Sequence, residues 1–171
     1  MSEEEFLALP ESADRIELVD GEVIVSPSPG VWHQELLARI AHRLRSWQEE
    51  HAAAAFVGLA PLDVRFAPGR ILQPDVFVCL EPVPFDHEGP LDRIPDLCVE
   101  VLSTNRAYDR LTKRVVYASS GVRELWLLEP SGSIERWSGG GLNEAEVLTA
   151  TLKTPLLEGF ELDIHELFRR S

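Results

Sequence analysis

The sequence predicts an α/β (α+β) fold in which a mixed central β-sheet is flanked by helices. Short apolar runs of strand length recur along the chain, and segments with helical spacing of apolar residues interrupt them. The chain has 171 residues, of which 44% are hydrophobic, so it is long enough to bury a core. It contains no internal repeat, low-complexity segment or dividing linker, which favours one domain over residues 1–171.

The N-terminal part predicts a hairpin followed by a helix. Residues 15–18 and 23–25 alternate in polarity around Asp20-Gly21, and this dipeptide is a strong hairpin signal. The Ser/Pro segment 26–30 then breaks the pattern. The residues that next recur at helical spacing, over about five turns, are Leu36, Leu37, Ile40, Leu44 and Trp47.

The middle of the chain reads as strands buried on both faces. Residues 54–59, 62–66, 71–80 and 97–102 are short and apolar at nearly every position, as parallel or mixed sheets require. A proline-rich loop over residues 81–95 separates the last two runs.

The C-terminal part predicts a helix, a hairpin and a short final helix. Asn105 is expected to cap a helix that runs to about Ser119, with Gly121 as its stop signal. Residues 124–128 and 133–137 form the expected hairpin, and a weaker strand is expected at 146–149 and a helix at 164–168. The Gly139–Gly141 stretch is interpreted as a loop, since it lacks the spacing of a phosphate cradle.

Composition limits the partners and the compartment. The net charge of −13, from 16 basic and 29 acidic residues, disfavours a broad nucleic-acid docking face, although acidic clusters also bind divalent ions. Cys79 and Cys98 lie in apolar runs and are expected to be inert core thiols. Residues 1–5 are acidic and lack a signal pattern, and no apolar stretch approaches ~20 residues. We expect a cytoplasmic protein with no membrane partner.

Two carboxylates interrupt the apolar runs. Asp75 and Glu100 lie where strands normally bury apolar side chains, and a buried charge is costly unless it is paired or binds a cation. If their strands are neighbours, both can converge on one Mg²⁺ or Mn²⁺ ion, with the carbonyl of Val101 as a further oxygen ligand. The alternative is that Asp75 is solvated at a strand entrance and that Glu100 pairs with an arginine.

Several segments together resemble a known family. Pro74-Asp75 with Val99-Glu100-Val101 is similar to the core of the PD-(D/E)XK nuclease superfamily. Over roughly residues 5–130 the chain more closely resembles the bacterial Uma-two-type restriction endonucleases. The segments that carry this resemblance are IELVDGE (16–22), SPSP (26–29) with His33 behind it, PLDVR (61–65), QPD (73–75), PDLCVEVLS (95–103), DRLTK (109–113) and YA with GVRELW (117–126). The resemblance implies a restriction-endonuclease-like sheet, divalent-metal dependence and phosphodiester hydrolysis.

The chain departs from the superfamily at one position. Leu102 stands where the superfamily has a lysine, two residues after the glutamate. Similar proteins carry their lysine later, which makes Lys113 the candidate to orient the attacking water and stabilise the phosphate. The alternative is an i,i+4 pair with Asp109 on a solvated helix face. The run from Ser103 to Asp109 is also one residue short, which could rotate the helix and misplace Lys113.

The resemblance adds candidates from the first hairpin and from the start of the helix that follows it. Glu17 is expected to support the metal shell, and its alternative is an exposed strand carboxylate. Glu22 is a weaker candidate, because an exposed strand carboxylate is its more usual interpretation. His33 is a candidate phosphate contact or general base, although a single histidine near a helix start is more often a capping or core-edge residue.

The functional hypothesis is a Mg²⁺- or Mn²⁺-dependent DNA endonuclease in which Asp75, Glu100, Glu17 and Lys113 are catalytic. The chain carries no G-x-S-x-G, H-E-x-x-H, paired C-x-x-C or P-loop motif, which disfavours serine hydrolases, zinc enzymes and nucleoside triphosphatases. The rival hypothesis is an inactive nuclease-fold module for binding or assembly. A third is a nuclease that acts on RNA or needs a partner subunit. A homodimer or higher homo-oligomer is expected, with the stretch from Trp126 to Trp137 as its interface or as core.

Overall fold

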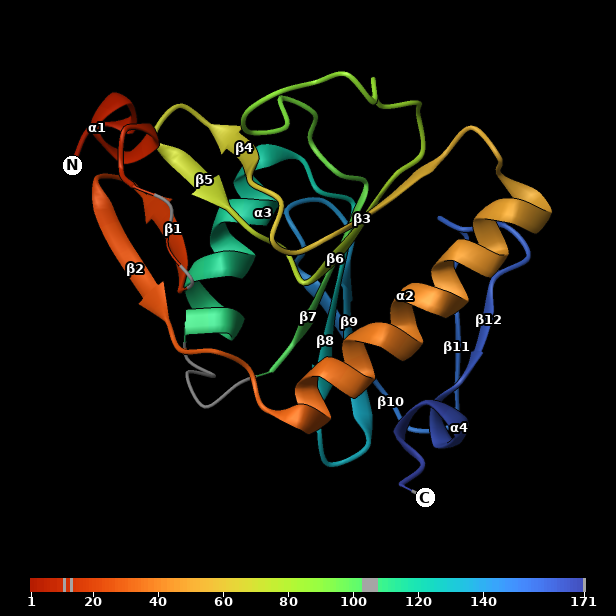
Figure 1. The fold of residues 1–171 in the computed structure, drawn as a ribbon. Coiled ribbons are helices and arrows are strands. Elements are labelled where there is room, and N and C mark those ends of the chain that lie inside the picture. Colours follow the sequence, from red (N-terminus) through yellow and green to blue (C-terminus); the bar gives the residue numbers. More distant parts are fainter. Residues whose placement is uncertain (11, 13, 103–107, 171) are drawn as a thin grey trace.

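The central element is a six-stranded mixed sheet (Figure 1). The computed structural model of the protein describes residues 1–10, 12, 14–102 and 108–170. The strand order is β10-β9-β8-β7-β6-β3, in which β7 and β8 pair in parallel and the other neighbours pair antiparallel. The strands are β3 (Phe56–Leu59), β6 (Val76–Cys79), β7 (Leu97–Val101), β8 (Glu124–Glu129), β9 (Ser133–Ser138) and β10 (Glu144–Leu148).

Two smaller sheets accompany it. The four-stranded sheet has the order β2-β1-β5-β4 and is antiparallel throughout. Its strands are β1 (Arg15–Val19), β2 (Glu22–Ser26), β4 (Val64–Ala67) and β5 (Arg70–Leu72). A two-stranded sheet joins β11 (Thr151–Lys153) to β12 (Glu161–Asp163). The hairpin predicted around Asp20-Gly21 is present as β1 and β2, and the predicted 124–137 hairpin is present as β8 and β9.

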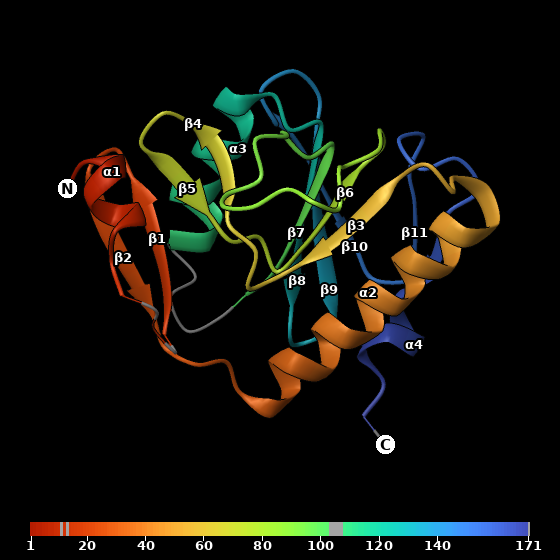
Figure 2. The same ribbon diagram turned by 45° about the horizontal axis from the view of Figure 1, so that its top comes forward.

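The helices lie on both faces of the six-stranded sheet. They are α1 (Glu3–Leu7), α2 (Val31–His51), the π-helix η1 (Tyr108–Lys113), α3 (Arg114–Ser120) and α4 (Ile164–Phe168). Figures 1 and 2 show α2 lying against one face with α4 beside it, whereas α3 and the four-stranded sheet lie on the other side. Gly121 ends α3 in the left-handed conformation, with φ of 93°, as the stop signal predicts.

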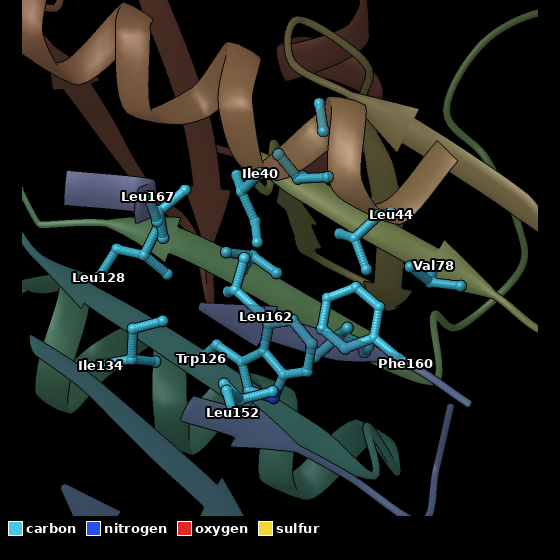
Figure 3. Close-up of a cluster of buried hydrophobic side chains, with 14 of the residues drawn as sticks. Ile40, Leu44, Val78, Trp126, Leu128, Ile134, Leu152, Phe160, Leu162 and Leu167 are labelled. Atoms are coloured by element: carbon cyan, nitrogen blue, oxygen red, sulfur yellow. The ribbon is translucent and has the colours of Figure 1, made fainter. Parts of the chain in front are cut away.

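Alternation along the strands separates two hydrophobic clusters. Val76, Val78, Val99 and Val101 pack with α2, α4 and Trp126 in one cluster. Figure 3 shows part of this cluster, with Val78 and Trp126 of the sheet labelled. Phe77, Cys79 and Cys98, on the opposite side of β6 and β7, pack with residues of α3 in the other cluster. Both cysteines are buried and free, in agreement with the prediction of core thiols.

The run over residues 71–80 differs from the prediction of one strand. It is broken between Leu72 and Val76, so that β5 belongs to the four-stranded sheet and β6 to the six-stranded sheet. Pro74 lies in the break, and a proline cannot donate a ladder hydrogen bond. This break brings the two sheets together at Asp75.

Other elements were not expected from the sequence. These are α1, which Ser2 and Glu5 begin with a capping box, and the pair β11 and β12. The predicted cap Asn105 lies outside the described residues. Among the helices that the structure describes, none combines the length and apolar character that crossing a membrane requires.

Candidate active site

Strand alternation places Asp75 and Glu100 on the face that α3 covers. Glu100 lies between Val99 and Val101, which face α2, and therefore points to the opposite side of β7. The antiparallel register pairs Val76 with Val99, and one further step places Asp75 beside Glu100. The two side chains are 2% and 1% exposed. Asp75 is thus buried, and the alternative of a solvated strand entrance does not hold.

The four-stranded sheet contributes Glu17. Ile16 and Leu18 pack with Phe6, so Glu17, between them on β1, faces the other way. Its side chain is fully buried, which excludes an exposed strand carboxylate. Oε1 accepts a hydrogen bond from the backbone amide of Gln73 at 2.8 Å, and Oε2 accepts one from the Tyr108 hydroxyl at 3.1 Å.

Lys113 and Tyr117 reach Glu100 from the helical segment after β7. Lys113 Nζ donates to Glu100 Oε2 at 2.8 Å and lies 3.5 Å from Glu17 Oε1. The Tyr117 hydroxyl donates to Glu100 Oε1. Because Lys113 is only 2% exposed, it does not lie on a solvated helix face. The π-helical turn η1 ends at Lys113, and such widened turns are frequent at functional sites.

Arg15 was not singled out in the sequence, yet its guanidinium joins all three carboxylates. Nη1 donates to Asp75 Oδ1 at 2.7 Å, and Nη2 lies 3.3 Å from Glu17 Oε1 and 3.7 Å from Glu100 Oε2. Arg15 is the first residue of β1 and shares a face with Glu17, two positions later. This i,i+2 spacing from Glu17 was the signal in the sequence that could have identified Arg15 as part of the site. The predicted pairing of Glu100 with an arginine is therefore present, over a longer distance than its contact with Lys113.

His33 approaches from the first turn of α2. Its Nε2 lies 3.3 Å from Asp75 Oδ2, while its Nδ1 is buried without a hydrogen-bond partner among the described residues. Glu22, by contrast, is exposed on β2, as the alternative of an exposed strand carboxylate predicted.

The neighbouring charges shift the pKa values of Asp75, Lys113 and His33 toward the ionised forms. Burial alone would raise the pKa of Asp75, but the hydrogen bond from His33 and the charges of Arg15 and Lys113 outweigh it and hold that pKa well below 3.8. Burial would lower the pKa of Lys113, yet Glu100 and Glu17 raise it above 10.5, so its ammonium stays protonated at neutral pH. Burial also opposes the charge of His33, but Asp75 raises the pKa of its imidazole above 6.5.

The site forms one wall of a cavity of about 800 Å³. The polar wall contains Arg15, His33, Asp75, Glu100 and Lys113. The opposite walls are largely apolar and proline-rich, with contributions from α1, the segment before α2, and α2 itself. The carboxylates therefore face a space large enough for a small ligand or one nucleotide unit.

The donor set fits a divalent cation in its chemistry, but the guanidinium of Arg15 occupies the space between the three carboxylates. Three buried carboxylates from two sheets supply the oxygen ligands that Mg²⁺ and Mn²⁺ prefer. As the side chains stand, however, no three His, Cys, Asp or Glu residues in the described part of the chain are gathered closely enough to hold an ion. The backbone amide of Val101 donates to Asp75 Oδ2 at 2.7 Å, so this residue contacts the site through its nitrogen.

Comparison with known proteins agrees with this fold. A solved structure from Anabaena variabilis, described as a putative nuclease belonging to DUF820, superimposes with a TM-score of 0.82. It is 23% identical, and the match covers 98% of this chain and 97% of that one, which confirms the predicted mixed sheet flanked by helices. A comparison with curated proteins gave no match. The family model Uma2, described as "Putative restriction endonuclease", matches residues 3–165. The resemblance seen in the sequence is thereby confirmed, and the chain belongs to the Uma2 family.

Proposed function

We propose that this protein is a divalent-metal-dependent endonuclease that hydrolyses phosphodiester bonds of DNA with Mg²⁺ or Mn²⁺. One observation carries the proposal: the buried carboxylates Asp75 and Glu100 meet Lys113 on the wall of a large cavity, and the fully buried Glu17 lies behind them, 3.5 Å from Lys113 Nζ. A buried cluster of three carboxylates is costly unless cations neutralise it, and clusters of this kind mark functional sites. The description of the family as restriction endonucleases and of the structural neighbour as a nuclease supports the same activity.

Asp75 and Glu100 are the proposed metal ligands, with Glu17 supporting them and the Val101 carbonyl as a further oxygen. When bound, the ion would lower the pKa of a coordinated water and neutralise the phosphate. Glu17 is anchored by the amide of Gln73 and the hydroxyl of Tyr108, so its carboxylate is held in place before an ion arrives.

Lys113 acts in this proposal as a fixed positive charge. Its raised pKa keeps the proton on Nζ, so it can donate to an attacking water or a phosphate oxygen but cannot serve as a base. The raised pKa of His33 likewise favours its protonated form, which suits a phosphate contact better than a general base.

The cavity explains how an acidic chain can engage DNA. With a net charge of −13, the protein repels a polyphosphate at long range. The reacting phosphodiester must therefore enter the cavity, where Arg15, Lys113 and His33 provide local positive charge. We further propose that the chain is one cytoplasmic domain and that two copies associate, because a two-fold dimer can meet both strands of a duplex. Light scattering that gives a strict monomer would contradict a two-strand cutter.

The test is cleavage of supercoiled plasmid and single-stranded DNA, with RNA as a further substrate, in Mg²⁺, Mn²⁺ and EDTA. Wild type should nick DNA only with metal, and Glu100→Gln should not. Glu124→Gln is the matched control, because Glu124 is also a buried strand carboxylate, 4% exposed, but pairs with Arg136 away from the cavity. Equal cleavage by wild type and Glu100→Gln would refute the assignment, and cleavage of RNA alone would move the substrate from DNA to RNA.

A specific observation favours the second candidate, an inactive binding or assembly module. Arg15 already neutralises the carboxylates, and Leu102 replaces the lysine of the superfamily. Calorimetry separates the two candidates, because an inactive module of this kind would bind no Mn²⁺ at millimolar concentration.

A further inference from the structure

The position of Arg15 suggests how the site is held before metal arrives. We propose that Arg15 is an internal counter-cation that must leave the three carboxylates before a divalent ion binds, and that its freed guanidinium then receives the phosphodiester. This inference rests on the proposed function, because it concerns the same metal site.

The guanidinium and a metal ion cannot share these carboxylates. Asp75 Oδ1 is engaged by Arg15 at 2.7 Å, and Oδ2 by the amide of Val101 at 2.7 Å. The other end of the guanidinium lies between Glu17 and Glu100, at 3.3 and 3.7 Å. A Mg²⁺ ion needs carboxylate oxygens at ~2.0–2.1 Å, which leaves no room for the planar group among them.

The net charge of the site indicates that the divalent ion binds before the phosphodiester. The three carboxylates with Lys113 and Arg15 carry a formal net charge of −1, or 0 when the His33 imidazole is protonated, so the closed site has no excess positive charge for a phosphate. Addition of a divalent ion, with Arg15 still in the cavity wall, makes the net charge positive in either case. A phosphodiester carries one negative charge, so the site becomes complementary to it only after the ion has bound.

The freed guanidinium has a place in the cavity. Arg15 lines the cavity, and its side chain is 21% exposed there, although the carboxylates behind it are buried. Its Nε is buried without a hydrogen-bond partner in the described part of the chain, so the present contacts leave one donor unused. Guanidinium groups bind phosphate oxygens through two parallel hydrogen bonds, which a lysine cannot do.

The first measurement is Mn²⁺ affinity by calorimetry for wild type, Arg15→Gln and Arg15→Lys. The Arg15→Gln variant should bind Mn²⁺ about tenfold or more tightly than wild type. In wild type, the apparent Mn²⁺ affinity is reduced because most molecules are in the closed state, in which Arg15 contacts the carboxylates. The Mn²⁺ affinity of Arg15→Lys should lie between those of wild type and Arg15→Gln. This variant replaces Arg15→Gln in the test if Arg15→Gln folds poorly. Arg70→Gln is the matched control, since Arg70 pairs with Asp20 outside the cavity and its loss should leave Mn²⁺ affinity unchanged.

The second measurement is binding of dimethyl phosphate, the smallest phosphodiester, followed by phosphorus NMR relaxation in Mn²⁺. Arg15→Gln should bind it about tenfold more weakly than wild type while binding Mn²⁺ more tightly, and a purely structural role would not give opposite signs. Equal Mn²⁺ affinity in wild type and Arg15→Gln would overturn the inference and leave the proposed nuclease intact. Absence of Mn²⁺ binding in every variant would overturn both.

Discussion

Replacement of Lys113 by methionine should reveal how strongly the buried carboxylates depend on it. Methionine keeps the unbranched apolar part of the side chain and removes the ammonium that lies 2.8 Å from Glu100 and 3.5 Å from Glu17. Removal of one partner from a buried ion pair costs about 3–5 kcal/mol. Because Arg15 still lies near both carboxylates, we expect a loss of about 3 kcal/mol in the free energy of unfolding. For a chain of this size that corresponds to a melting temperature lowered by about 6–12 °C.

Urea unfolding, followed by tryptophan fluorescence, measures this loss, because Trp47 and Trp126 are buried in the folded protein. In the double variant Lys113→Met/Glu100→Gln, the loss should fall short of the sum of the single losses by about 1–3 kcal/mol. Lys153→Met is the matched control, because Lys153 is 66% exposed in its pair with Glu161 and should cost less than about 0.5 kcal/mol. Additive losses, or a Lys113→Met variant as stable as the control, would refute the reasoning.

Three further substitutions test the hydrogen bonding, the acid stability and the packing of the protein. Tyr117→Phe removes the donor to Glu100 and should lower the free energy of unfolding by about 1–3 kcal/mol in the same urea assay. The folded-state pKa of Asp75 is depressed, so its contribution to stability is present above pH 3.8 and is lost as the pH falls toward the folded pKa. In an acid titration, the free energy of unfolding of Asp75→Asn should therefore decrease less with falling pH than that of wild type. Gly58→Ala would place a Cβ atom 2.1 Å from the Phe77 ring and should cost about 1–3 kcal/mol by thermal unfolding, with partial recovery on adding Phe77→Leu.

The elements with strong local signals were predicted correctly. The hairpin around Asp20-Gly21 and the long helix α2 follow from turn chemistry and apolar spacing, which act over a few residues. The short strands β11 and β12 were missed because each buries one residue, too few to give a period. The break at Pro74 was missed because the apolar run continues on both sides of it, although the proline itself was the signal.

The site was predictable where a residue conflicts with its surroundings. Asp75 and Glu100 are charges inside apolar runs, so the sequence alone shows that each needs a partner. Arg15 lies in a polar segment, where an arginine is ordinary, and its importance arises only when β1 packs against β6 and β7. The catalytic roles of Asp75, Glu100, Glu17 and Lys113, and the Val101 carbonyl ligand, stay predictions until the assays above are done.

The site is assembled from residues that lie about a hundred positions apart in the chain, since Arg15 and Glu17 come from the first hairpin and Lys113 and Tyr117 from the segment after β7. During synthesis on the ribosome, the carboxylates therefore emerge well before the lysine and tyrosine that neutralise or hydrogen-bond Glu100. A chain that ends at β7 carries all three carboxylates but lacks both of these partners of Glu100. The buried position of Glu100 in β7 therefore becomes favourable only after α3 has been made and has packed against the sheet.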